Sequence, residues 1–211
     1  VFLEKRGDGY CARLDTRMES VKVLGLVNIT VLAAGSIFTG SVHEPIKGTK
    51  NPQKMLQTGI PFTKKPVALQ FDYKVKMSDR ENRIRATGFS KITDVLGKDY
   101  PAAILLLQKR WEDANGNVYA KRIGTMVTYY YHSTDWKNNV TYEIMYGDIT
   151  NRPEYKAHMM RLQATESYTV NSKGESVPIH EVAWGDENDV PTHMYIQFTS
   201  SHGGAYIGSP G

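Results

Sequence analysis

Two segments alternate apolar and polar residues with a period of two, which is the pattern of a strand that buries one face. In residues 67–77, Phe71 lies on an apolar face and Asp72 on a polar one, and the neighbours on either side continue the alternation. Residues 193–200 repeat the pattern, with Ile196 on the apolar face. The sequence therefore predicts two half-buried strands.

Between these strands the pattern indicates a long β-hairpin. Residues 104–111 and 118–130 are strand-like, and residues 112–117 join them. The connection contains Asn115 followed by Gly116, which supply the positive φ angles that a tight hairpin turn requires. We expect this pair of strands to be antiparallel.

Further strands are expected at residues 9–16, 21–38, 82–90 and 142–146, with Gly25 and Gly35 as bulges or breaks in the second range. Helical periodicity is weak, and the best helix candidate is residues 154–163, directly after Pro153. Many short one-sided strands bury their apolar faces by pairing two sheets. The predicted fold is therefore all-β: an antiparallel β-sandwich of the jelly-roll type, with at most one short helix.

We expect one domain over residues 1–211, because the chain contains no repeat, low-complexity tract or linker. Two connections, residues 41–65 and 151–190, read as irregular apart from the helix candidate. Long loops of this kind in a compact sandwich often carry function or wrap a sheet edge. The first residue is Val1 and already reads as strand, so we expect the sequence to be a fragment of a longer precursor whose export signal is not in view.

Composition narrows the class of protein. The chain has 211 residues, of which 40% are hydrophobic and 23% charged, as in soluble globular proteins. The net charge is only +4, and the basic pairs are scattered among acidic residues, so we expect no nucleic-acid partner. Lys22 and Asn28 interrupt the most apolar stretch, residues 21–38, and this excludes a membrane-spanning helix there. The single cysteine, Cys11, cannot form an internal disulfide.

Several stretches resemble one family in the order in which they occur along the chain. They are GYCARLDT at 9–16, GIPFTKKP at 59–66 with FDY at 71–73, STDW at 133–136 with YEIMY at 142–146, and VPTHM at 190–194 with TSSHGGAYIG at 199–208. They resemble the putative carbohydrate metabolism domain family of Bacteroidetes surface proteins.

This resemblance implies a galactose-binding-like jelly roll, exported and tethered at the outer membrane as a lipoprotein. It also implies a polysaccharide-capturing assembly with other outer-membrane proteins as partners. The family has one more strand after the position of Gly211, so we expect the closing strand to lie outside this sequence.

Sugar recognition requires flat aromatic rings for the apolar faces of pyranoses, together with polar groups for the hydroxyls. Trp111 ends a predicted strand, and Trp184 lies in the second long connection, beside Asp186. Tyr129 and Tyr131 share one face of a strand, opposite the intervening tyrosine. These five residues are the candidate sugar contacts, although each aromatic ring could instead pack onto its own strand or loop. Trp136, which opens a strand, is expected to be a core anchor.

Other site chemistries are less well supported. Residues 113–117 place oxygen ligands at alternate positions but lack the glycine and terminal glutamate of a helix-loop-helix calcium loop. Residues 186–189 form a denser acidic cluster that is expected to be a solvated loop. The sequence HEVAW at 180–184 lacks the second histidine of a zinc-protease motif, and GFSKI at 88–92 lacks the closing glycine of a nucleophile elbow. We expect no catalytic residue, no metal site and no cofactor; a structural calcium ion is the open alternative, for which residues 186–189 are the better candidate although no motif supports it.

Three functions follow in order of preference. The first is a non-catalytic carbohydrate-binding module displayed at the cell surface. The second is a glycoside hydrolase that acts through a pair of carboxylates. The third is a structural module that binds another protein through an apolar surface.

Overall fold

The structure is a computed structural model, and it describes residues 1–23, 27–43, 51–88, 92–159, 167–204 and 206–211. Over these residues the chain forms β-strands, with one 3₁₀ turn, η1 (Pro52–Met55), and no α-helix. The expected all-β class is confirmed, and the sheets are mostly antiparallel, as in a β-sandwich, with one parallel pair. Gly25, expected as a bulge, lies outside the described residues.

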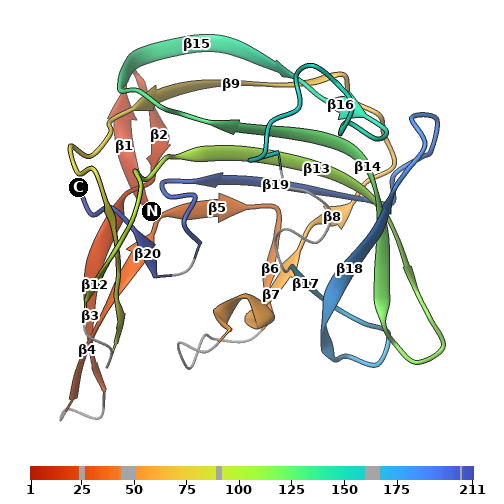
Figure 1. Cartoon of the computed structure of the whole chain (residues 1–211), viewed down its shortest axis with the longest axis horizontal. Coiled ribbons are helices and arrows are strands. Elements are labelled where there is room, and N and C mark those ends of the chain that lie inside the picture. The colour runs from red at the N-terminus through yellow and green to blue at the C-terminus, as the bar shows by residue number, and fades with distance from the viewer. Residues whose placement is uncertain (24–26, 44–50, 89–91, 160–166, 205) are drawn as a thin grey trace.

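One large curled sheet organises the molecule (Figure 1). Its main path runs in the order β17–β18–β14–β13–β19–β5, and the short strands β16 and β8 pair with β14 and β19. The bounds are β5 (Ser36–Phe38), β8 (Ile60–Pro61), β13 (Ala102–Glu112), β14 (Val118–Tyr129), β16 (Met145–Tyr146), β17 (Tyr168–Val170), β18 (Ser176–Trp184) and β19 (His193–Thr199).

The predicted hairpin forms the centre of this sheet. β13 and β14 pair antiparallel from Ala102 opposite Tyr129 to Glu112 opposite Val118. Gly116 takes a positive φ of 90° in the turn, and the Asp113 carboxylate accepts hydrogen bonds from the backbone N–H groups of Asn115 and Asn117. The positive φ angle predicted for the turn is confirmed at Gly116 and is wrong at Asn115, whose φ is not positive.

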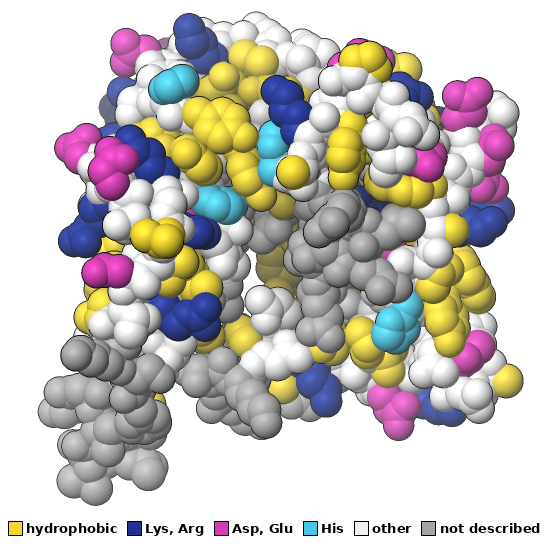
Figure 2. Space-filling view, in the orientation of Figure 1, with side chains coloured by type: hydrophobic (Ala, Val, Ile, Leu, Met, Phe, Trp, Pro, Cys, Tyr) yellow, Lys and Arg dark blue, Asp and Glu magenta, His cyan; other side chains and the backbone are white. Residues whose placement is uncertain are grey.

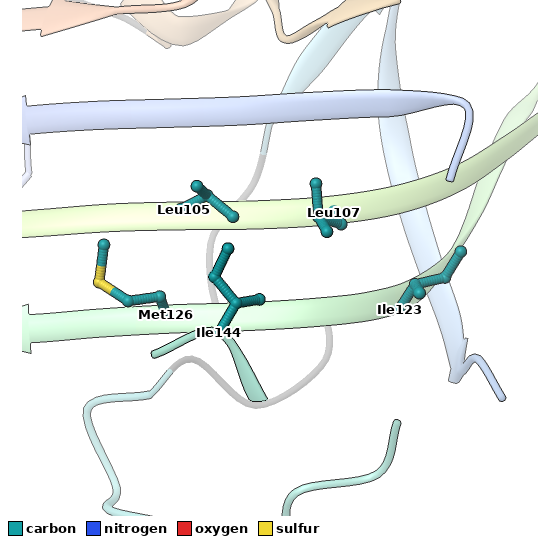
Figure 3. Close-up of a cluster of buried hydrophobic side chains, with 5 residues drawn as sticks. All are labelled: Leu105, Leu107, Ile123, Met126 and Ile144. Carbon is teal, nitrogen blue, oxygen red and sulfur yellow. The ribbon is translucent and has the colours of Figure 1, made fainter. Parts of the chain in front are cut away.

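A second layer lies over one face of the central strands (Figure 1). It consists of β9 (Ala68–Val75) and β15 (Thr134–Glu143), paired antiparallel. Between the layers lies a buried core of Leu105, Leu107, Ile123, Met126 and Ile144, which come from β13, β14 and the link before β16 (Figure 3). The alternation predicted for residues 67–77 holds in β9, where Phe71 and Tyr73 are less exposed than Asp72 and Lys74.

The remaining strands form small sheets around these layers. They are the hairpin β1–β2, the sheet β3–β4–β11, the sheet β12–β10–β20 and the pair β6–β7. Their bounds are β1 (Phe2–Arg6), β2 (Gly9–Arg13), β3 (Thr16–Val23), β4 (Val27–Ala34), β6 (Gly40–Val42), β7 (Leu56–Thr58), β10 (Arg83–Arg85), β11 (Thr87–Gly88), β12 (Thr93–Val95) and β20 (Ile207–Gly208).

Three expectations about the connections are wrong. Residues 151–190 are not an irregular loop, because they contain β17 and β18, and β18 pairs parallel with β14. Residues 41–65 contain β6, η1, β7 and β8. The helix expected over residues 154–163 is absent from its described part, where isolated turns bond Tyr155 N–H to Arg152 O and Met159 N–H to Lys156 O. Met159 packs against a buried cluster of the main sheet instead.

Candidate functional site

Three rings lie side by side across neighbouring strands at the outer end of the hairpin. Trp111 of β13 stands opposite Tyr119 of β14, and Tyr119 stands beside His180 of β18. The Trp111 and Tyr119 ring centroids are 5.8 Å apart with planes inclined by 24°, and the Tyr119 and His180 centroids are 5.7 Å apart at 40°. We call Trp111, Tyr119 and His180 the aromatic platform.

The platform is open to solvent because the covering layer does not extend over it. By alternation along β13, Trp111 lies on the same face as Leu105 and Leu107, which are buried beneath β9 and β15. Trp111 is nevertheless 43% exposed, and the His180 side chain is also exposed. The sheet thus presents the near-parallel rings of Trp111 and the half-buried Tyr119, with the more tilted His180 ring beside them.

The hairpin tip positions the middle ring of the platform. The Tyr119 hydroxyl lies 3.5 Å from Asp113 Oδ2, at the limit of a hydrogen bond. Asp113 also accepts bonds from the side chain and backbone of Asn117, and these bonds lower the pKa of the Asp113 carboxyl. Asp113 is therefore a turn-forming carboxylate that stays ionised at neutral pH.

Tyr129 and Tyr131 belong to a second group of rings at the opposite end of β14. His158 stacks on Tyr129 with centroids 4.5 Å apart, and Tyr100 meets Tyr131 edge to face at 4.7 Å. His202 lies 5.0 Å from Tyr129. We call these five residues the tyrosine–histidine cluster.

The rings of the tyrosine–histidine cluster mainly contact one another. Tyr131 is 46% exposed, whereas Tyr129, His158 and His202 are half-buried. Burial raises the pKa of Tyr129 and lowers the pKa of His158, so both side chains are neutral at neutral pH. Figure 2 shows histidine side chains among hydrophobic ones on the face turned to the viewer. The cluster ties together chain segments that are distant in sequence.

The remaining predicted contacts lie elsewhere. Trp184 ends β18 and is half-buried, with the guanidinium carbon of Arg122 5.5 Å from its ring centroid. Asp186 follows in an exposed turn, where its Oδ1 accepts a bond from Asn188 N–H and its N–H donates to Asp189 Oδ2. The placement of Trp184 in a loop was wrong, because it lies in a strand.

The five predicted residues therefore do not form one site. Trp111 and Tyr129 sit at opposite ends of the hairpin, because Trp111 pairs with Tyr119, ten positions before Tyr129 in β14. At roughly 3.3 Å per residue this separates them by about 30 Å. Of the five, only Trp111 is an exposed ring that lies near-parallel to a ring on the neighbouring strand.

The comparison with family models assigns the chain to a family. The model described as "Putative carbohydrate metabolism domain" matches residues 1–211. The chain belongs to this family. No curated protein and no solved structure matches the chain significantly. Family membership relates this chain to carbohydrate. It does not specify which residues would contact a sugar.

Sequence reasoning missed two of the three platform residues. Tyr119 was part of a predicted strand, but its neighbours across the sheet were unknown. His180 was placed in a loop and considered only as part of a failed zinc motif. The sequence does contain a signal for Tyr119. Trp111 and Tyr119 flank an Asn-Gly turn, and the pairing of the two hairpin strands brings residues on either side of the turn together.

On the opposite face of the same strands lies a buried polar network. Arg122 is 1% exposed and Glu181 is 5% exposed, and the Glu181 carboxylate accepts bonds from Arg122 Nε at 2.8 Å and from Arg122 Nη2. Gln108 donates to Glu181 and accepts from Arg110 Nε. Burial lowers the pKa of Arg110 to about 10, so it remains a cation. This network holds β18 against the centre of the sheet.

His193 is expected to weaken the fold in acid. Burial, with a further contribution from the Arg110 cation, lowers the pKa of His193 to about 4. An unfolded histidine has a pKa of about 6.5, so between these values only the unfolded chain binds the proton. The contribution of His193 is therefore fully present above about pH 6.5 and falls as the pH drops toward 4.

The measurement is urea unfolding of the wild type and His193→Gln at about pH 7 and about pH 4.5. Because His193 is partly exposed, we expect the wild type to lose only about 1 kcal/mol more than the variant. Carboxylates with lowered pKa also lose stability in acid, but both proteins share that loss. An equal loss in the two proteins would contradict the prediction.

Within the described ranges, no group of three or more His, Cys, Asp or Glu side chains is arranged to hold a metal ion. The same ranges contain no helix with the length and apolarity to span a bilayer. On the face shown in Figure 2, Lys and Arg side chains are interspersed with Asp and Glu.

Proposed function

We propose that this domain is a non-catalytic carbohydrate-binding module that docks a glycan on the aromatic platform. The observation that carries the proposal is the alignment of the exposed Trp111 ring with the half-buried Tyr119 ring on the adjacent strand, with planes inclined by only 24°. Family membership supplies the ligand class. The alternative function, binding of another protein, would need an exposed apolar surface but no alignment of ring planes.

The platform suits the two-sided chemistry of a pyranose. The ring faces of Trp111 and Tyr119 offer apolar area to the C–H faces of sugars, while the His180 ring nitrogens can bond to hydroxyls. Because each ring packs against its neighbour on the paired strand, binding orders few of their rotamers. A preformed surface therefore loses little conformational entropy on binding.

The electrostatics of the carboxylates favour binding over hydrolysis. A glycosidase acid needs a raised pKa so that it is protonated at neutral pH. Hydrogen bonds lower the pKa of the two carboxyls that follow Trp111 in the sequence, Glu112 and Asp113, and the Lys173 cation contributes at Glu112. The same direction of shift holds for Asp15, Asp72, Asp148 and Asp189.

A glycan array probed with the purified chain, followed by chromatography of any bound oligosaccharide after incubation, tests this function. We expect retention of at least one glycan class and recovery of that glycan intact. Shortened products would favour the hydrolase, and absence of retained glycans with a normally folded protein would refute the proposal.

We also propose that the domain acts at the outer membrane of a Bacteroidetes cell, as a lipoprotein within a polysaccharide-capturing assembly. The motivation for this location is the resemblance of the sequence to surface proteins of that family. Protease digestion of intact source cells is the test: an exposed domain is degraded while a periplasmic marker survives. Protection of the domain in intact cells would contradict surface display.

A further inference from the structure

Two lysines face each other beside the aromatic platform. Lys109 of β13 pairs directly with Lys121 of β14, and by strand alternation both share the platform face of the sheet. Each lysine is two residues from its platform neighbour, Trp111 or Tyr119. This spacing is about 7 Å along the strand.

Like charges directly opposite one another destabilise a strand pair unless an opposite charge lies between them. Asp189 supplies one such charge, with its Oδ1 2.9 Å from Lys109 Nζ. The bond from Lys109 is the largest cause of the lowered pKa of Asp189, and Lys121 contributes through its charge. One carboxylate thus faces two ammonium groups.

Lys121 remains available to a ligand. Its side chain is exposed, and within the described ranges it makes no hydrogen bond and no ion pair. Lys109, by contrast, is held by Asp189. The side of the platform toward the centre of the sheet therefore carries an uncommitted cation.

The other nearby acids are directed elsewhere. Asp186 bonds to Asn188 N–H in its own turn, and Asp113 bonds to the hairpin tip beyond the platform. Glu187 lies beside Gly147, which bonds to Ile123 O, two residues along β14 from Lys121, but within the described residues the Glu187 side chain makes no ion pair. The offset between Ile123 and Lys121 is roughly 7 Å along the strand.

We propose that the aromatic platform selects glycans that carry an anionic substituent, with the sugar ring on Trp111 and Tyr119 and the anion bound by Lys121. The shared chemistry is a carboxylate, as in a uronic acid, or a sulfate ester. This inference rests on the proposed function and adds the substrate class.

The test measures dissociation constants at low salt for four polymers: polygalacturonate, its methyl ester, a sulfated galactan and the same galactan after desulfation. We expect the wild type to bind an anionic polymer more tightly than its neutral counterpart. Lys121→Met should weaken that binding by roughly threefold to tenfold and leave neutral binding unchanged. The preference should shrink at high salt.

Lys137→Met is the matched control. Lys137 is also an exposed strand lysine, on β15, and its removal lowers the net charge by the same amount. Equal weakening by the two variants would overturn the proposal, because it would show attraction to the overall charge. Equal wild-type affinity for neutral and anionic polymers would also overturn it, yet would leave carbohydrate binding standing. Comparing the polygalacturonate and sulfated arms identifies which anion is preferred.

Discussion

Glu181→Ala is expected to destabilise the domain by about 3 to 5 kcal/mol, because it removes a carboxylate that is bonded twice to a buried guanidinium. Arg122 is only 1% exposed, so water cannot replace those bonds without opening the sheet. For a chain of this size the melting temperature should fall by roughly 10 °C. Thermal and urea unfolding monitored by circular dichroism measure both effects.

Two control variants test whether the loss of stability comes from burial of the ion pair and not from the loss of any ion pair. Lys98→Ala breaks an exposed pair with Glu81 and is expected to change the free energy of unfolding little. The double variant Arg122→Met, Glu181→Leu replaces both charges with apolar side chains and should recover most of the lost stability. If Glu181→Ala costs no more than Lys98→Ala, the network does not stabilise the position of β18.

Trp111→Ala is expected to weaken glycan binding by about 30-fold or more, the loss typical of an aromatic anchor worth roughly 2 kcal/mol or more. Trp111 contributes a large exposed face of the platform and pairs with Tyr119. Because Trp111 is already 43% exposed, the change should cost little stability. Titration calorimetry with a glycan retained on the array gives the affinity.

Tyr131→Ala is the matched control, since Tyr131 is exposed to a similar extent, at 46%, and lies at the far end of the hairpin. We expect it to bind the glycan as the wild type does. The reverse outcome, with binding lost in Tyr131→Ala and kept in Trp111→Ala, would move the site to the tyrosine–histidine cluster.

β18, which the sequence pattern did not predict, shows why the alternation of apolar and polar residues can fail to reveal a strand. β18 contains Pro178, which usually argues against a paired strand, and Glu181, a charge at a buried position. Glu181 is tolerated there because Arg122, 59 residues away in sequence, completes its bonds. Such compensation between distant positions does not appear in local periodicity.

The period-two alternation and the Asn-Gly turn determined, from the sequence alone, an all-β chain built on a long antiparallel hairpin, because side-chain direction and turn geometry are local properties. The tertiary structure alone decided which aromatic residues meet. The parallel pairing of β18 with β14 brings His180 to Tyr119, and the curl of the sheet leaves Trp111 uncovered. Register between strands depends on packing across the whole sheet, so no single segment encodes the platform.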